Sequence, residues 1–170
     1  MSTPGKPQDP TAVPGPGEAE IPGARYVHTN LVARDWRALA AFYVSVLGCK
    51  PVGPERRLSG PEIEDGTGIP GARIEGAHLA LPGWPEGGPT LEIFAYTPDL
   101  PHPGTDLHRP GFGHLAFAVP DVASAREAVL AAGGHPVGEI VRHEVEGAGT
   151  VTWCYVTDPE GNGLELQSWS

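Results

Sequence analysis

The stretch PEGNGLELQS, residues 159–168, places Glu165 between two leucines directly after a tight turn. A second stretch, PEGGPTLEIF, residues 85–94, repeats this form, with a Pro-Glu-Gly turn followed by Glu92 between two aliphatic residues. Successive side chains of a β-strand point to opposite faces, so each Glu would project away from its apolar neighbours. Two carboxylates in matching places indicate an internal repeat with a shared purpose.

A helix is expected at the same position in each half of the chain. DWRALAAFYVSVLG has apolar residues at helical spacing, with Asp35 as N-cap and Gly48 as the C-terminal stop. Its counterpart, DVASAREAVLAAGG, begins with Asp121, 86 positions after Asp35. Strands flank both helices, so the sequence predicts two tandem β-α-β-β-β modules and an α+β fold. The expected strands are residues 26–32, 49–53, 72–83 and 90–98, then 113–121, 135–145, 149–158 and 163–169, with a short helix and a loop at 54–71.

The composition divides the chain into a tail and one domain. Residues 1–23 are rich in Pro and Gly and poor in apolar residues, which predicts a disordered tail. Residues 24–170 are expected to form a single domain, made of modules 24–98 and 111–170. The first module is the longer one, since it carries about 13 extra residues in its middle.

The charge balance narrows the possible partners. The chain has 11 basic and 21 acidic residues and a formal net charge of −10, which argues against nucleic acid and anionic membranes. No stretch is apolar for long enough to cross a membrane. Two cysteines do not indicate a disulfide framework, so a cytoplasmic protein is expected.

Two histidines complete the repeat of the two glutamates. His28 and His114 lie 86 positions apart, at equivalent places in the first strand of each module. Alternation puts both imidazoles, with Glu92 and Glu165, on the faces opposite the aliphatic residues. Each residue alone is more often structural or solvated, but the duplication favours one metal site where two curved sheets meet. Imidazole and carboxylate together suit a divalent transition metal such as Ni, Co, Zn or Fe.

Three stretches resemble one family. LAAFYVSVLG, GFGHLAFAVPDV and DPEGNGLEL are similar to motifs of the vicinal oxygen chelate superfamily, which includes glyoxalase I, methylmalonyl-CoA epimerase, extradiol dioxygenases, and fosfomycin and bleomycin resistance proteins. The resemblance covers about residues 25–169. It implies a glyoxalase fold with paired βαβββ modules around an open, barrel-like cleft. It also implies a homodimer, with the cleft built within one chain or across two. Carried over residue by residue, the metal ligands fall on His28, Glu92, His114 and Glu165.

The resemblance further implies an activity. Glyoxalase-like lyases, isomerases and epimerases bind vicinal oxygens of a small-molecule substrate at the metal and stabilise an enediolate. In this chain Glu165 is the first candidate for the carboxylate that also moves the proton, and Glu92 is the second. An enzyme similar to lactoylglutathione lyase is therefore expected.

The substrate-binding residues are less clearly marked. Phe94 and Tyr96 share the face of Glu92, and Arg109 precedes the PGFGH stretch close to where glyoxalase I has a glutathione-binding Arg. Two other glutathione-binding positions of glyoxalase I hold Val32 and Tyr96 here, instead of Arg and Asn. The sequence leaves open whether the substrate contains a thiol such as glutathione, and which thiol that is.

Two other function classes stay open. An extradiol-type dioxygenase uses two His and one carboxylate, and Glu92 as a fourth ligand counts against it. A non-catalytic drug-binding protein of the bleomycin resistance kind lacks the metal ligands, so the presence of all four counts against that class.

Overall fold

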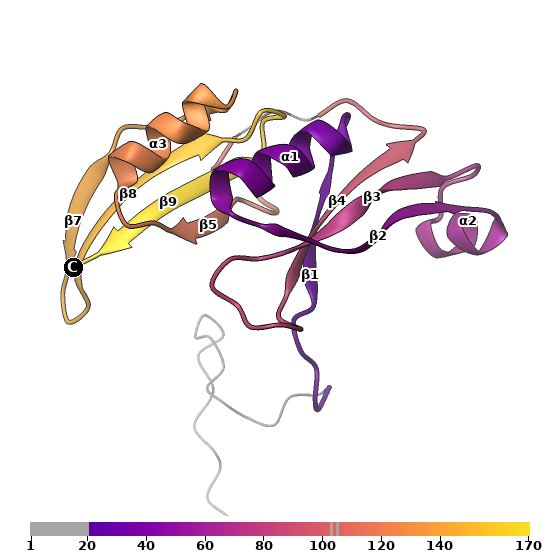
Figure 1. Ribbon diagram of the computed structural model, residues 1–170, viewed down its shortest axis with the longest axis horizontal. Coiled ribbons are helices and arrows are strands. Elements are labelled where there is room, and N and C mark those ends of the chain that lie inside the picture. The colour runs from indigo at the N-terminus through magenta and orange to yellow at the C-terminus, as the bar shows by residue number, and fades with distance from the viewer. Residues whose placement is uncertain (1–20, 103, 105) are drawn as a thin grey trace, which may run out of the picture.

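The computed structural model describes residues 21–102, 104 and 106–170, and most of the expected tail lies outside them. The described chain forms two mixed sheets, each with one helix packed along it (Figure 1). The first module contains β1 (His28–Val32), α1 (Trp36–Leu47), β2 (Lys50–Ser59), α2 (Pro61–Thr67), β3 (Arg73–Ala80) and β4 (Thr90–Thr97). The second contains β5 (Leu115–Ala118), α3 (Val122–Ala131), β6 (His135–Pro136), β7 (Val141–Val145), β8 (Gly149–Thr157) and β9 (Gly163–Trp169).

The strand order is the same in both sheets. The first sheet has the order β1-β4-β3-β2, and the second has β5-β9-β8-β6, with β7 also paired to β8. In each sheet the first strand lies parallel to the last, while the other pairs are antiparallel. The predicted α+β fold with two tandem modules is confirmed.

Strand register confirms the repeat at single-residue level. Asn30 pairs with Glu92 between β1 and β4, and Ala116 pairs with Glu165 between β5 and β9. Asn30 and Ala116 are 86 positions apart, the same interval that separates the predicted histidines. Both glutamates therefore occupy the same place in their sheets.

Three details differ from the expectation. The predicted strand 135–145 is divided into β6 and β7, because Pro136 lacks a ladder donor and Gly138 weakens the strand that follows. In the first module β2 continues to Ser59, beyond the expected strand 49–53, while α2 is the short helix expected within residues 54–71. His114 lies just before β5 rather than inside a strand.

Local capping explains where the two long helices begin. The Asp35 carboxylate accepts hydrogen bonds from the backbone N–H groups of Arg37 and Ala38, and Asp121 accepts one from Ser124 N at 2.7 Å. Gly48 ends α1 in the left-handed conformation, as predicted.

The core lies between the helices and the sheets. Helices α1 and α3 lie on the same side of the molecule, above their sheets in Figure 1. The aliphatic neighbours of both glutamates are fully buried in this core and belong to the same apolar cluster; they are Leu91, Ile93, Leu164 and Leu166. Glu92 and Glu165 consequently point to the sheet faces that the helices leave uncovered. Among the described residues, no helix has the length and apolar character needed to span a membrane.

A buried polar contact ties the two modules together. The Tyr43 hydroxyl on α1 donates a hydrogen bond of 2.9 Å to Asp158 Oδ2, in the turn between β8 and β9. Asp158 is completely buried and also accepts bonds from Asn162 Nδ2 and from the backbone N–H groups of Glu160 and Asn162. The Glu160 carboxylate accepts hydrogen bonds from the backbone N–H groups of Arg34 and Asp35, directly before α1, at 2.7 and 2.8 Å.

Removal of the Tyr43 hydroxyl should destabilise the fold measurably. We expect Tyr43→Phe to lower the free energy of unfolding by about 1–3 kcal/mol, because the buried Asp158 Oδ2 loses one of its two donors. Tyr26→Phe, at an exposed position, is the matched control and should change it by less than about 0.5 kcal/mol. Urea unfolding followed by circular dichroism measures both. Equal stability of the two variants would show that this contact does not hold the modules together.

Candidate functional site

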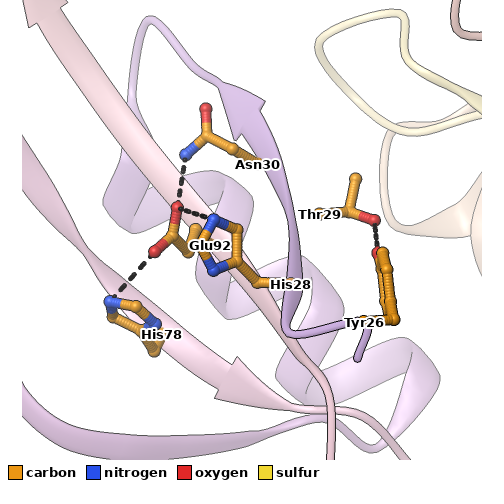
Figure 2. A network of polar contacts seen from close by, with 6 residues as sticks. All are labelled: Tyr26, His28, Thr29, Asn30, His78 and Glu92. Atoms are coloured by element: carbon orange, nitrogen blue, oxygen red, sulfur yellow. Dashed lines mark hydrogen bonds and ion pairs between the residues drawn. The ribbon is translucent and has the colours of Figure 1, made fainter. Parts of the chain in front are cut away.

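The first module gathers four polar side chains, which we call the first cluster: His28, Asn30, His78 and Glu92. Figure 2 shows the side chains of His28, Asn30 and His78 directed at the Glu92 carboxylate. His28 Nε2 lies 3.3 Å from Glu92 Oε2, and Asn30 Nδ2 donates to the same oxygen at 3.3 Å. His78 Nε2 lies 3.3 Å from the other oxygen, Oε1. Both carboxylate oxygens are therefore occupied.

The first cluster arises from three adjacent strands. The parallel pairing of β1 with β4 sets Asn30 beside Glu92 and puts His28 two residues earlier on the same face. The antiparallel pairing of β3 with β4 sets His78 directly opposite Glu92. The Glu92 side chain is 12% exposed and His28 is 42% exposed, so the imidazole forms the open edge of the cluster. Burial lowers the pKa of His78, although the neighbouring Glu92 charge acts in the opposite direction.

The second module contains a similar group, the second cluster, formed by His114, Tyr155 and Glu165. His114 Nε2 lies 2.9 Å from Glu165 Oε2. Tyr155 lies opposite Glu165 in strand register and interacts with its carboxylate, and the Tyr155 ring centroid lies 5.0 Å from that of His114. Burial raises the pKa of Tyr155, and the Glu165 charge raises it further.

A glycine allows His114 to approach the last strand. A Cβ atom on Gly163 would lie 2.9 Å from the carbonyl oxygen of Gly113 and 3.3 Å from Cβ of His114. The first distance is shorter than side chains tolerate, so Gly163 is required for the close contact between the start of β9 and the segment that carries His114.

The structure brings the four predicted metal ligands together in two pairs. His28 meets Glu92 in the first module, and His114 meets Glu165 in the second. Within residues 21–102, 104 and 106–170, no set of three or more His, Cys, Asp or Glu side chains is placed so that it could hold a metal ion. The convergence of all four at one metal stays a prediction.

The donor chemistry of the pairs nevertheless fits a divalent transition metal. In each pair an imidazole Nε2 faces a carboxylate oxygen on a sheet face that no helix covers. Each pair supplies only two donors, whereas protein sites for such metals use three or four protein ligands. A metal site therefore needs both pairs.

The predicted substrate residues occupy different surroundings. Phe94 is 7% exposed, and its ring packs edge-on against that of His78 with the centroids 5.6 Å apart. Tyr96 is half-buried further along the same face of β4. Arg109 forms an ion pair with Asp106 and lines a hollow beside Gly163, on the side of the second cluster.

His78 and Tyr155 are the site residues that the sequence analysis missed. Both lie on strands that were predicted correctly, but their relation to the glutamates depends on antiparallel register. The hairpin between β3 and β4 has a long connection, and such a turn does not fix register from sequence. Once the register is known, the two residues are found easily, because His78 and Tyr155 each lie directly opposite one of the two glutamates.

Comparison with known proteins identifies the type of fold. The family model described as Glyoxalase/Bleomycin resistance protein/Dioxygenase superfamily matches residues 25–166. No curated protein matches the sequence.

Solved structures resemble the chain along most of its length. A glyoxalase family protein from Bacillus cereus has 20% identity and a TM-score of 0.69, with 89% of this chain and 97% of that one covered. A glyoxalase/bleomycin resistance protein/dioxygenase family enzyme from Burkholderia phytofirmans has 17% identity and a TM-score of 0.54, covering 86% and 100%. A genomically encoded fosfomycin resistance protein from Listeria monocytogenes has 18% identity and a TM-score of 0.50, covering 88% and 94%. At these identities the likeness establishes the fold alone.

The close approach at Gly163 gives a direct test of the second cluster. We expect Gly163→Ala to lower the free energy of unfolding by about 1–3 kcal/mol, because the added methyl group forces backbone apart. Gly113→Ala is the control, since a Cβ there meets no atom within 4 Å. Denaturant unfolding of both variants makes the comparison. If Gly163→Ala is as stable as Gly113→Ala, β9 and the His114 segment are not in close contact.

Proposed function

Because the chain belongs to the glyoxalase/bleomycin resistance protein/dioxygenase superfamily, we propose that it is a metal-dependent enzyme of the lyase, isomerase or epimerase type. The observation that carries this proposal is the duplicated His–Glu pair. Each module places an imidazole nitrogen next to a carboxylate oxygen, at 3.3 Å in one and 2.9 Å in the other, at equivalent positions of the repeat. A binding protein without metal has no need for this duplication.

The proposed metal ligands are His28, Glu92, His114 and Glu165, for one divalent ion such as Ni, Co, Zn or Fe. Imidazole nitrogen and carboxylate oxygen suit these ions, and four protein ligands leave positions for substrate oxygens. The two pairs belong to separate sheets that share no strand pairing among the described residues. We propose a homodimer in which the first cluster of one chain meets the second cluster of its partner. The exposed imidazole of His28 and the half-buried imidazole of His114 would then lie at the contact.

The chemistry follows from the donors. When bound, the metal would supply Lewis-acid polarisation to adjacent oxygens of a small-molecule substrate. A carboxylate beside it can then take the proton from the carbon next to a carbonyl and return it elsewhere. This reaction type covers glyoxalase-like isomerisation and epimerisation.

The two carboxylates differ in a way that favours Glu165 as the proton carrier. Glu92 is held by an amide donor, Asn30, in addition to two imidazoles. At the equivalent of Asn30 the second module has Ala116, which offers no side-chain donor. Glu165 is also slightly more exposed, at 18% against 12%. A less restrained carboxylate can move between metal and substrate more readily, while Glu92 serves as the fixed ligand.

The neighbouring side chains suggest the setting of the reaction. Phe94 packs beside the first cluster and Tyr96 lies beyond it on the same face, so both are candidates for the wall of a partly apolar substrate pocket. Arg109, near the second cluster, is the candidate for holding an anionic substrate group. Cys49 and Cys154 are free and buried, which favours the reducing cytoplasm as the compartment.

An extradiol-type dioxygenase is the second candidate function. One observation bears on it: the first cluster contains two imidazoles and one carboxylate, the ligand types of an open iron site, although among the described residues no such set of three is placed to hold a metal ion by itself. Oxygen uptake with catechols, dependent on iron, would separate this activity from proton-transfer chemistry. The absence of such uptake in the iron-loaded protein would exclude it.

Metal titration and turnover test the main proposal. We expect purified protein to bind one Co²⁺ or Ni²⁺ per chain, and His28→Ala or His114→Ala to weaken binding by more than about tenfold. Glu165→Gln should abolish turnover in a screen of thiohemiacetals and acyl-CoA epimers. His143→Ala, an exposed His on β7, is the matched control and should behave like the unaltered chain. Failure of the unaltered chain to bind any divalent transition metal would overturn the enzyme assignment.

A further inference from the structure

Each candidate metal-binding carboxylate has a second polar partner on the adjacent antiparallel strand. His78 on β3 pairs in register with Glu92 on β4, and Tyr155 on β8 pairs in register with Glu165 on β9. His78 Nε2 lies 3.3 Å from Glu92 Oε1, and the Tyr155 side chain interacts with the Glu165 carboxylate. The two modules thus use the same position for different donors, an imidazole in one and a phenol in the other.

Aromatic rings hold both of these partners in place. The Phe94 ring packs edge-on against His78, with centroids 5.6 Å apart and an interplanar angle of 79°. The Trp153 ring packs against Tyr155 in the same manner, at 5.0 Å and 68°. Such contacts restrict the side-chain rotamers of His78 and Tyr155, and a restricted donor fixes the group that it binds.

The backbone opposite Phe94 is adapted to this packing. Gly76 on β3 pairs with Phe94, and a Cβ atom there would lie within 2.2 Å of the Phe94 ring. The ring can therefore lie across β3 and reach His78 only because position 76 lacks a side chain. The second module places its aromatic residue on the other strand, as Trp153 of β8 opposite Gln167. An aromatic ring therefore packs against the partner of the glutamate in both modules, from β4 in the first and from β8 in the second.

We propose that His78 and Tyr155 are positioning residues, one for each metal-binding carboxylate; this inference rests on the proposed metal-dependent function. His78 contacts Oε1 of Glu92, whereas Asn30 and His28 contact Oε2, so a metal bound by His28 would meet Oε2. With Oε1 held by His78, Glu92 would bind the metal through Oε2 and could not rotate away from it. Groups that orient ligands in this way typically contribute 10–100-fold to metal affinity.

Substitutions at His78 distinguish a role as hydrogen-bond donor from a role in packing. His78→Gln keeps an N–H donor near the position of Nε2, whereas His78→Leu keeps the bulk and removes the donor. His143→Leu, on the exposed surface of β7, is the matched control. Tyr155→Phe removes only the hydroxyl in the second module. Circular dichroism of the metal-free proteins confirms that each variant is folded before Co²⁺ is added.

Co²⁺ affinity by calorimetry and the visible absorption of the bound Co²⁺ are the measurements. We expect His78→Leu and Tyr155→Phe each to weaken Co²⁺ binding by about 10–100-fold. We also expect His78→Gln to restore most of the affinity and His143→Leu to leave it unchanged. The stoichiometry should stay the same in all variants, and the Co²⁺ spectrum of His78→Gln should match that of the unaltered protein.

Several outcomes would overturn this inference. Unchanged Co²⁺ affinity in folded His78→Leu and Tyr155→Phe would show that these donors do not position the carboxylates. Complete loss of the site in both His78→Leu and His78→Gln, with an altered Co²⁺ spectrum, would identify His78 as a direct ligand instead. If the unaltered chain binds no Co²⁺, the proposed function itself fails and the positioning role with it; the first two results leave that function intact.

Discussion

The parallel pairing of the first and last strand within each module determines where the candidate site lies. Parallel register places a histidine two residues before the partner of a glutamate, on the same face of the sheet. The opposite face is fixed because the leucine and isoleucine neighbours of the glutamates are fully buried under the helices. A shift of one residue in either strand would turn the carboxylate into the apolar core, so register and hydrophobic burial enforce each other.

The turn that leads into the last strand joins the two modules. Asp158 is buried and satisfied by Tyr43 from the first module and by donors of its own turn, and Glu160 in the same turn binds the start of α1. The residues of the DPEGNG stretch therefore have a structural role: they fix the strand that carries Glu165 relative to the first module. Buried carboxylates need such a full set of donors, because an unpaired one would be strongly destabilising.

The sequence predicts the modules, the helix caps and the four residues that form the two His–Glu pairs, because each depends on local periodicity or on a repeat interval. Asp35 and Gly48 could be assigned from their neighbours alone, and Glu165 from alternation. His78 and Tyr155 could not, since their roles come from antiparallel register, which for His78 spans the long β3–β4 connection, and from aromatic packing. The division of residues 135–145 into two strands was also missed, and its cause is local, in Pro136 and Gly138.

The proposed function requires that the two His–Glu pairs form one metal site between two copies of the chain. A mixing experiment distinguishes this arrangement from a site built within one chain. One variant carries His28→Ala with Glu92→Ala, and the other carries His114→Ala with Glu165→Ala. Neither should bind Co²⁺ tightly alone, but after unfolding and refolding together they should form a heterodimer that binds one Co²⁺, because each supplies the pair that the other lacks. If the unaltered protein binds Co²⁺ and the refolded mixture does not, the shared site is contradicted.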